Sequence, residues 1–266
     1  MAWPNRDAIA ESVAQMLRVN MGLKAPERLL VVTDLPRPEE WQTLPQALLE
    51  DMLERAMLAR LVADIARERA PGCTVVFLPF PASGGHGTEP DPATAARLRD
   101  ADVVIALTTY SLSHTNAREE ATRGGVRLAS MPSFEAQMFE AAGPMAVDYQ
   151  QVAASCRRFA DLLTAAQEAV VRTPLGTDLR FSLAGRRGDA DDGLLGVAPG
   201  AWGNLPAGEA YIAPLEGTGE GLLVAPAGWF PGLAQDLAFR FAQGEVVEVR
   251  GGGVVGDEFR RLLKPG

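Results

Sequence analysis

The residues best suited to chemistry lie in one short stretch, residues 204–221, with the sequence NLPAGEAYIAPLEGTGEG. Pro206 fixes one backbone angle and Gly208 frees another, so we expect a sharp turn just before Glu209. A short strand over residues 210–213 follows the turn. A carboxylate held by a tight turn beside a strand has a fixed direction, as a metal ligand or a general base requires. The alternative is a hairpin turn in which Glu209 is solvated.

Further metal ligands are scarce in this chain. It has only two histidines, His86 and His114, and both lie in its first half. Glu216 lies in a second turn of the same stretch, where we expect it to assist Glu209 by position or by hydrogen bonding. Catalytic metal sites use about three protein ligands and one open position, so Glu209 alone is not expected to bind a divalent ion tightly.

Two serines and a histidine stand together in residues 111–114. A serine nucleophile is disfavoured, because no G-x-S-x-G elbow surrounds either serine and sequence neighbours seldom face one another. We expect instead that Ser113 caps a helix and that His114 stands at the start of that helix, with contact to a ligand as the alternative. The aspartates of residues 186–193 lack the later glutamate of a calcium loop and are expected to be solvated.

Four short apolar runs in the first half of the chain alternate with helical patterns. The runs cover residues 28–33, 74–79, 102–107 and 126–130. This alternation predicts an α/β fold, with a parallel sheet and helices on both of its faces. Ligands of such sheets bind at the carboxyl ends of the strands, where we expect His86 and residues 108–114 to lie.

The pattern of residue types changes after a long helical pattern over residues 148–172. Short strands and many glycines follow, with one strand expected at residues 194–197 and a terminal hairpin around Gln243. We therefore expect two domains. The first is an α/β domain of Rossmann or flavodoxin type over residues 1–173, and the second is a smaller β-rich domain over residues 174–266.

Composition narrows the class of protein. Hydrophobic residues make up 47% and charged residues 22% of the chain, which is ordinary for a globular protein. The net charge of −9 repels phosphate backbones, so nucleic acid is not an expected partner. No apolar run reaches the ~18 residues that span a bilayer, and no secretory pattern opens the chain, so no membrane association is expected. Cys73 and Cys156 are too few for a disulfide framework, which fits the cytoplasm.

Several stretches together resemble the thermophilic metallo-aminopeptidases of the aminopeptidase T and S type, a leucyl aminopeptidase-like family. They are residues 113–118 (SHTNAR), 127–132 (RLASMP), 176–179 (GTDL), 204–209 (NLPAGE) and 244–251 (GEVVEVRG). The resemblance implies hydrolysis of N-terminal residues from peptides, with a divalent metal of the zinc, cobalt or manganese type. It also implies that Glu209 is one ligand of that metal.

In this family the other ligands are a second Glu, two His, a Tyr and an Asp, all beyond the last hairpin. The sequence stops before that part. The resemblance therefore implies that residues 174–266 are the front of the metal-binding catalytic domain, and that the chain is weakly active or inactive as a peptidase.

The resemblance also suggests where a substrate would bind. We expect the cleft between the two domains to be lined by Tyr110, His114, Arg118, Asn204 and Glu216. The expected partner is a peptide or another small molecule. The sequence does not decide whether the chain also forms a homodimer.

Two other functions stay open at this point. Iron-dependent dioxygenases that cleave the ring of a dihydroxypyridine belong to the same superfamily and share its fold. Alternatively, the protein is not catalytic and binds a small molecule at the strand ends or assembles with itself. Product assays with a peptide amide and with a dihydroxypyridine would separate the two enzymatic functions.

Overall fold

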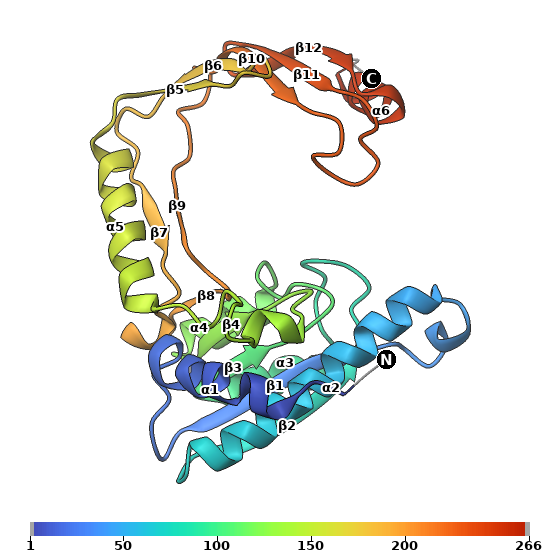
Figure 1. Ribbon diagram of the computed structural model, residues 1–266, viewed down its shortest axis with the longest axis vertical. Helices are drawn as coiled ribbons and strands as arrows, with labels where there is room; N and C mark the ends of the chain where they lie inside the picture. Colours follow the sequence, from blue (N-terminus) through green and yellow to red (C-terminus); the bar gives the residue numbers. More distant parts are fainter. Residues whose placement is uncertain (1–2, 264–266) are drawn as a thin grey trace. The chain divides into compact units, whose positions relative to one another are not determined.

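The computed structural model describes residues 3–263, which divide into two compact units (Figure 1). Unit 1 comprises the chain up to Ser155 together with Asp191–Glu209, and unit 2 comprises Cys156–Ala190 and the chain from Ala210 onward. The chain therefore leaves unit 1 within helix α5 (Tyr149–Ala165) and returns to it once before the last part of the sequence.

Unit 1 is built on a five-stranded parallel sheet with the strand order β2–β1–β3–β4–β8. Its strands are β1 (Arg28–Leu35), β2 (Thr74–Pro81), β3 (Val103–Ala106), β4 (Arg127–Ser130) and β8 (Trp202–Asn204). The four apolar runs of the sequence all form parallel strands with helices between them, which confirms the predicted α/β fold class. The short fifth strand, β8, comes from the returning segment and was not predicted.

Helices cover both faces of this sheet. They are α1 (Arg6–Gln15), α2 (Gln46–Arg69), α3 (Pro92–Arg99), α4 (Asn116–Arg123) and the first part of α5, with short turns η1 (Met16–Asn20), η2 (Glu40–Gln42), η3 (Ala136–Phe139) and η4 (Leu195–Val197). Leu29 and Val31 of β1 belong to a core with α1 and α2, whereas Leu30 and Val32 belong to a core with α3 and α4. Successive side chains of a strand point to opposite faces, so a continuous apolar run is what a doubly covered strand requires.

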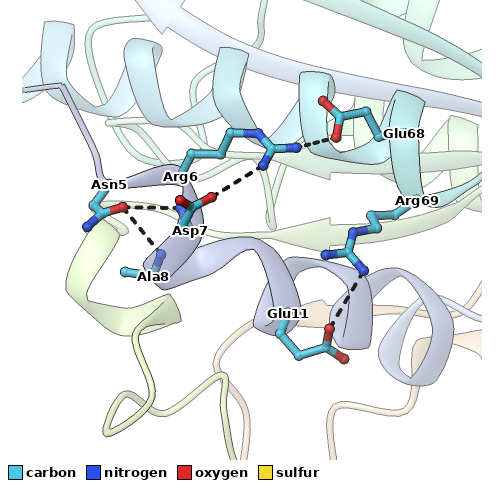
Figure 2. A network of polar contacts seen from close by, with 7 residues as sticks. All are labelled: Asn5, Arg6, Asp7, Ala8, Glu11, Glu68 and Arg69. Atoms are coloured by element: carbon cyan, nitrogen blue, oxygen red, sulfur yellow. Dashed lines mark hydrogen bonds and ion pairs between the residues drawn. The ribbon is translucent and has the colours of Figure 1, made fainter.

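Polar contacts join the start of α1 to the end of α2, as Figure 2 shows. Asn5 caps α1 by accepting a hydrogen bond from the backbone N–H of Asp7 at 3.1 Å. Two ion pairs connect the helices, Arg6 with Glu68 and Arg69 with Glu11. Exposed ion pairs contribute about 0–1 kcal/mol each, so the apolar core of this face stabilises the packing more than they do.

The returning segment packs on unit 1 through a close approach of two backbones. A Cβ built on Gly196 would lie 2.7 Å from the Cα of Gly22, and Gly22 itself has a φ of +55°. The buried side chain of Asn20 donates a hydrogen bond to the carbonyl of Gly193 at 2.8 Å. These contacts anchor the segment that supplies β8 to the sheet.

Unit 2 contains a five-stranded antiparallel sheet with the order β12–β11–β10–β6–β5. Its strands are β5 (Glu168–Arg172), β6 (Asp178–Ser182), β10 (Glu220–Ala225), β11 (Leu237–Ala242) and β12 (Glu245–Gly251). Helix α6 (Gly253–Leu262) packs against β12, and the Phe259 ring meets the Phe239 ring edge-on at a centroid distance of 5.0 Å. The β11–β12 hairpin turns at Gln243, as predicted. Two shorter strands, β7 (Asp189–Asp191) and β9 (Glu209–Tyr211), pair with each other.

Two elements differ from the sequence-based expectations. The helix expected over residues 148–172 ends at Ala165, and Glu168–Arg172 is strand β5, because its β-branched Val170 and Val171 pair with β6 across a tight turn. The strand expected at residues 194–197 is largely the 3₁₀ turn η4. Leu194 and Leu195 bury their side chains in the core of unit 1 there.

Within residues 3–263, no helix is both long enough and apolar enough to cross a membrane.

Candidate functional site

The strand order of the parallel sheet reverses between β1 and β3. Strand β2 lies on one side of β1, whereas β3, β4 and β8 extend from the other side. Ligands of open α/β sheets bind beyond the carboxyl ends of the strands at such a point. Hydrogen bonds join the end of β1 and the loop after β2 to the loop after β3, so this edge is the candidate site of unit 1.

A buried carboxylate, Asp34, joins the ends of β1 and β3. Its Oδ1 accepts a hydrogen bond from the N–H of Thr109 at 2.6 Å, and its Oδ2 accepts one from the N–H of Tyr110 at 3.2 Å. Burial raises the pKa of Asp34, while the hydrogen bonds from Thr109 and Tyr110 and the charge of Arg55 oppose the rise. With both oxygens engaged, Asp34 fixes the loop after β3.

Arg55 of α2 supports the same loop. Its side chain is almost completely buried, and one guanidinium nitrogen donates a hydrogen bond to Thr109 Oγ1 at 2.8 Å. The other terminal nitrogen pairs with Asp51 at 2.6 Å. The Arg55 Nε is buried and has no hydrogen-bond partner among the described residues. One donor of a buried cation is therefore unsatisfied among the described residues.

A cavity of about 540 Å³ opens beside Arg55. Trp3 and Phe134 contribute aromatic surface to its wall. The wall also carries acceptor groups, the carboxylates of Glu50, Asp51, Glu54, Glu135 and Glu140. Its volume is within the range of small-molecule sites, about 300–1,000 Å³. Aromatic walls, several acceptors and one strong donor suit a small aromatic molecule with polar substituents.

His86 and Tyr110 come from the loops after β2 and β3 and lie edge to face, with ring centroids 5.8 Å apart. The Nδ1 of His86 accepts a hydrogen bond from the N–H of Ser111 at 3.1 Å. The N–H of Gly87 donates in turn to the carbonyl of Ser111 at 3.0 Å. In its neutral form His86 therefore carries its proton on Nε2, which makes that nitrogen a donor.

Ser113 connects two of the residues expected to line the substrate site. Its Oγ donates a hydrogen bond to Asn204 Oδ1 at 3.0 Å, and its carbonyl accepts one from Arg118 Nε at 2.9 Å. The guanidinium of Arg118 also stacks on the ring of Trp202, 3.9 Å from its centroid. The structure thus brings Arg118 and Asn204 together at the junction of α4 and β8.

His114 is exposed and lies just before α4, but the cap of this helix differs from the expectation. Thr115 caps α4, since its Oγ1 accepts a hydrogen bond from the N–H of Arg118 at 3.1 Å. Glu89 accepts two more hydrogen bonds from the first backbone N–H groups of the helix. Ser113, expected as the cap, is instead committed to Asn204.

The turn expected before Glu209 is present. The peptide bond between Leu205 and Pro206 is cis, and Gly208 has a φ of +147°. The N–H of Gly208 donates to the carbonyl of Asp191 at 3.0 Å, and Glu209 then opens β9 with an exposed side chain. The turn thus brings Glu209 next to the segment that contains Asp191.

Asp191 and Glu209 are electrostatically coupled. Burial and then the charge of Glu209 raise the pKa of Asp191 to about 6, although a hydrogen bond from the backbone of Asn204 lowers it. Asp191 is half-buried at the end of β7, so it does not lie in the solvated loop that the sequence suggested. Two carboxylates that repel each other in this way are stabilised by a bound cation.

This pair does not make a complete metal centre. Within the part of the chain that the structure describes, no three His, Cys, Asp or Glu side chains are grouped so that they could hold an ion. Two carboxylates fall short of the about three protein ligands of a catalytic site. Glu216, expected to assist Glu209, belongs to unit 2 and forms an ion pair with Arg186 there.

Asp34 and Arg55 were not predicted from the sequence, although the position of each in the sequence is informative. Asp34 is a charged residue directly after a buried apolar run, where a parallel strand presents its carboxyl end. Arg55 shares a helical face with the buried residues Met52 and Ala59, an unusual place for a charge. Charged residues on otherwise apolar faces would have identified the buried support of this edge.

Two solved structures share this fold. The first is the 2,5-dihydroxypyridine dioxygenase from Pseudomonas putida KT2440, with a TM-score of 0.67 and 17% sequence identity, covering 97% of this chain and 72% of that one. The second is wild-type AmpT from Thermus thermophilus, with a TM-score of 0.58 and 20% identity, covering 97% and 74% of the two chains. At these identities the likeness concerns the fold alone. No curated protein matches the chain.

A family model described as 2,5-dihydroxypyridine 5,6-dioxygenase (NicX) matches residues 51–264. The match covers most of the sequence, and the chain belongs to this family. The expected metallo-aminopeptidase, a peptide hydrolase, is therefore wrong, and the ring-cleaving alternative fits better. Membership of this family supports a metal cofactor in general without specifying the ion.

Proposed function

We propose that the protein takes part in the oxidative ring cleavage of a hydroxylated pyridine. The match of residues 51–264 to the dihydroxypyridine dioxygenase family carries this proposal. The similar structure from Pseudomonas putida supports it, because that protein is a 2,5-dihydroxypyridine dioxygenase.

The ring is proposed to bind in the cavity beside Arg55. Trp3 and Phe134 offer surfaces for an aromatic ring, and the carboxylates of the wall accept hydrogen bonds from ring hydroxyl and N–H groups. Arg55 is the one cationic side chain among the residues that line this cavity. Tyr110 and the Arg118–Asn204 pair lie at the carboxyl edge of the same sheet, and we include them as candidate contacts.

Glu209 is proposed as one metal ligand, with Asp191 as its neighbour. The described residues alone do not supply a full ligand set. Carboxylate oxygens suit Mn²⁺, which is a convenient paramagnetic probe. We expect weak binding, which Glu209→Gln should weaken at least about fivefold in a titration of water proton relaxation.

Glu216→Gln is the matched control, because Glu216 pairs with Arg186 in the other unit. It should bind Mn²⁺ as the wild type does. Equal affinities for the wild type and Glu209→Gln would remove Glu209 from the ligand set.

Binding of the ring is tested by anaerobic calorimetry with 2,5-dihydroxypyridine. We expect one site per chain with a Kd between about 1 μM and 1 mM, the usual range for enzyme substrates. Trp3→Ala removes one aromatic wall of the cavity and should weaken binding about tenfold.

Trp229→Ala is the control for this experiment, because Trp3 and Trp229 are 61% and 59% exposed and Trp229 belongs to unit 2. It should leave the affinity unchanged. Absence of binding to the wild type would contradict the proposed function. Equal losses of affinity in both variants would show that the ring does not bind in the cavity beside Arg55.

A further inference from the structure

A second cavity of unit 1 lies at the amino ends of β1 and β2, at the edge of the parallel sheet opposite the candidate site. It is formed by α1, η1, the end of α2 and the loops that lead into β1 and β2. Its volume is about 300 Å³. This is the lower limit of small-molecule sites, about 300–1,000 Å³, so a ligand bound here would be small.

The loops around this cavity are held in place without a ligand. The N–H of Leu23, in the loop before β1, donates a hydrogen bond to the carbonyl of Leu17 in η1 at 2.8 Å. A Cβ built on Gly72 would lie 3.1 Å from the Cβ of Ala25, so the loops before β1 and β2 are in close contact. The cavity is therefore preformed, and binding would not have to order its walls.

The lining of this cavity is positively charged. Three cationic side chains contribute to it, those of Arg18, Lys24 and Arg69, and Glu11 is the one carboxylate. Three cations less one carboxylate give a local charge of +2, in a chain whose net charge is −9. The cavity beside Arg55 is lined instead by five carboxylates and one cation. Because charges of one sign in a concave site attract ligands of the opposite sign, this second cavity suits an anion.

Two of these cations are not neutralised by neighbouring side chains. Among residues 3–263, neither the guanidinium of Arg18 nor the ammonium of Lys24 forms an ion pair. Glu27 follows Lys24 closely in the sequence, but its carboxylate accepts a hydrogen bond from the backbone N–H of Lys24 at 2.9 Å and pairs with Arg127 at 2.6 Å. The charges of Arg18 and Lys24 are therefore available to a ligand.

The third cation, Arg69, is only loosely paired. Its guanidinium lies 3.9 Å from the carboxylate of Glu11, as Figure 2 shows, and both side chains are exposed. Charge-assisted hydrogen bonds are shorter, about 2.7–2.9 Å, and exposed ion pairs contribute little stability. A ligand carboxylate can therefore compete with Glu11 for Arg69.

The backbone and the apolar part of the lining indicate which kind of anion fits. Phosphate sites commonly use backbone N–H groups at the start of a helix. Here α2 and η1 come to their carboxyl ends, which present carbonyl groups. Leu17, Leu23 and Pro71 add apolar surface to the wall. Cationic side chains beside apolar surface suit carboxylates joined by a short hydrocarbon chain.

From these observations we infer that the cavity at the amino ends of β1 and β2 binds a short-chain dicarboxylate. Arg18, Lys24 and Arg69 together pair with its two carboxylates, and its carbon chain packs on Leu17 and Leu23. This cavity shares no lining residue with the cavity beside Arg55. The inference therefore extends beyond the proposed function and does not depend on it.

Calorimetry with succinate tests the site, at low ionic strength because salt screens exposed charges. We expect one succinate per chain with a Kd of about 1 mM or below. Butyrate has the same number of carbons but a single carboxylate, and should bind at least about tenfold more weakly. Absence of succinate binding would overturn the inference, as would equal affinity for butyrate or for inorganic phosphate.

Arg18→Gln and Lys24→Gln each remove one cation from the cavity. Each should weaken succinate binding at least about fivefold. Arg158→Gln is the matched control, because it makes the same change of charge at an exposed arginine of unit 2. It should leave the affinity unchanged. Equal losses in all three variants would reflect net charge alone and would contradict a site in this cavity.

Glu11→Gln tests the inference in the opposite direction. It removes the carboxylate that competes with the ligand for Arg69, so succinate should bind about two- to threefold more tightly. Glu11 is exposed, so the fold should be retained, and a damaged fold would not raise the affinity. Unchanged or weaker binding by Glu11→Gln would remove Arg69 from the site and overturn the inference as stated.

Discussion

Replacing Asp34 with alanine is expected to lower the free energy of unfolding by about 4 kcal/mol. The N–H groups of Thr109 and Tyr110 lose their acceptor, and each unsatisfied buried donor costs about 1–3 kcal/mol. The buried guanidinium of Arg55 also loses a nearby opposite charge. Urea unfolding followed by circular dichroism measures the loss.

Asp102→Ala is the matched control for this experiment. Asp102 also accepts a backbone hydrogen bond, from Arg28 at 2.7 Å, but it is exposed. Water can replace that acceptor, so the cost should stay below about 1 kcal/mol. Similar losses for Asp34→Ala and Asp102→Ala would show that Asp34 does not hold the edge of the sheet.

Replacing Gly196 with valine is expected to detach the returning segment from unit 1. A Cβ at this position would lie 2.7 Å from the Cα and N of Gly22 and 3.0 Å from the carbonyl carbon of Met21, all backbone atoms. Backbone cannot yield as a side-chain end does, so the cost should be about 3 kcal/mol or more. Limited proteolysis should then cut within residues 191–209 much faster than in the wild type.

Gly219→Ala is the control, because its Cβ would meet nothing closer than 3.4 Å and its φ is not positive. It should change neither the stability by more than about 0.5 kcal/mol nor the rate of cleavage. If Gly196→Val unfolds and is cleaved like the wild type, the two backbones do not approach each other closely.

The parallel sheet could be predicted because each strand is a continuous apolar run between helical patterns. Strand β8 could not, since Trp202–Asn204 joins the sheet only by pairing with β4, which lies far earlier in the sequence. A three-residue strand carries no periodicity to detect. The return of the chain to unit 1 could therefore not be predicted from the sequence.

At strand β5, a helical spacing of apolar residues overlaps with a short β-branched strand sequence. Apolar residues at helical spacing continue past the end of α5 to Val170, so the helix was extended too far. The competing information was the pair of adjacent β-branched residues, Val170 and Val171, followed by a turn. Tertiary pairing with β6 decided between the two.

At the candidate site, the turn before Glu209 was predictable, since Pro206 fixes one backbone angle and Gly208 permits a positive φ. The partners of Glu209 and Asn204 were not, because Asp191 and Ser113 lie far away in the sequence. The choice of chemistry failed for a different reason. The aminopeptidase-like motifs lie on a fold that a dioxygenase and AmpT both share, so they indicated the fold more reliably than the reaction.

The proposed function is tested most directly by offering both kinds of substrate to the protein at once. Metal-free protein is mixed anaerobically with equal amounts of 2,5-dihydroxypyridine and leucinamide, and saturation-transfer NMR reports which molecule binds. We expect saturation of the ring protons of the pyridine alone, with a weaker signal for Trp3→Ala and an unchanged one for Trp229→Ala. Saturation of leucinamide, or of neither molecule, would contradict a protein built to bind a hydroxylated pyridine.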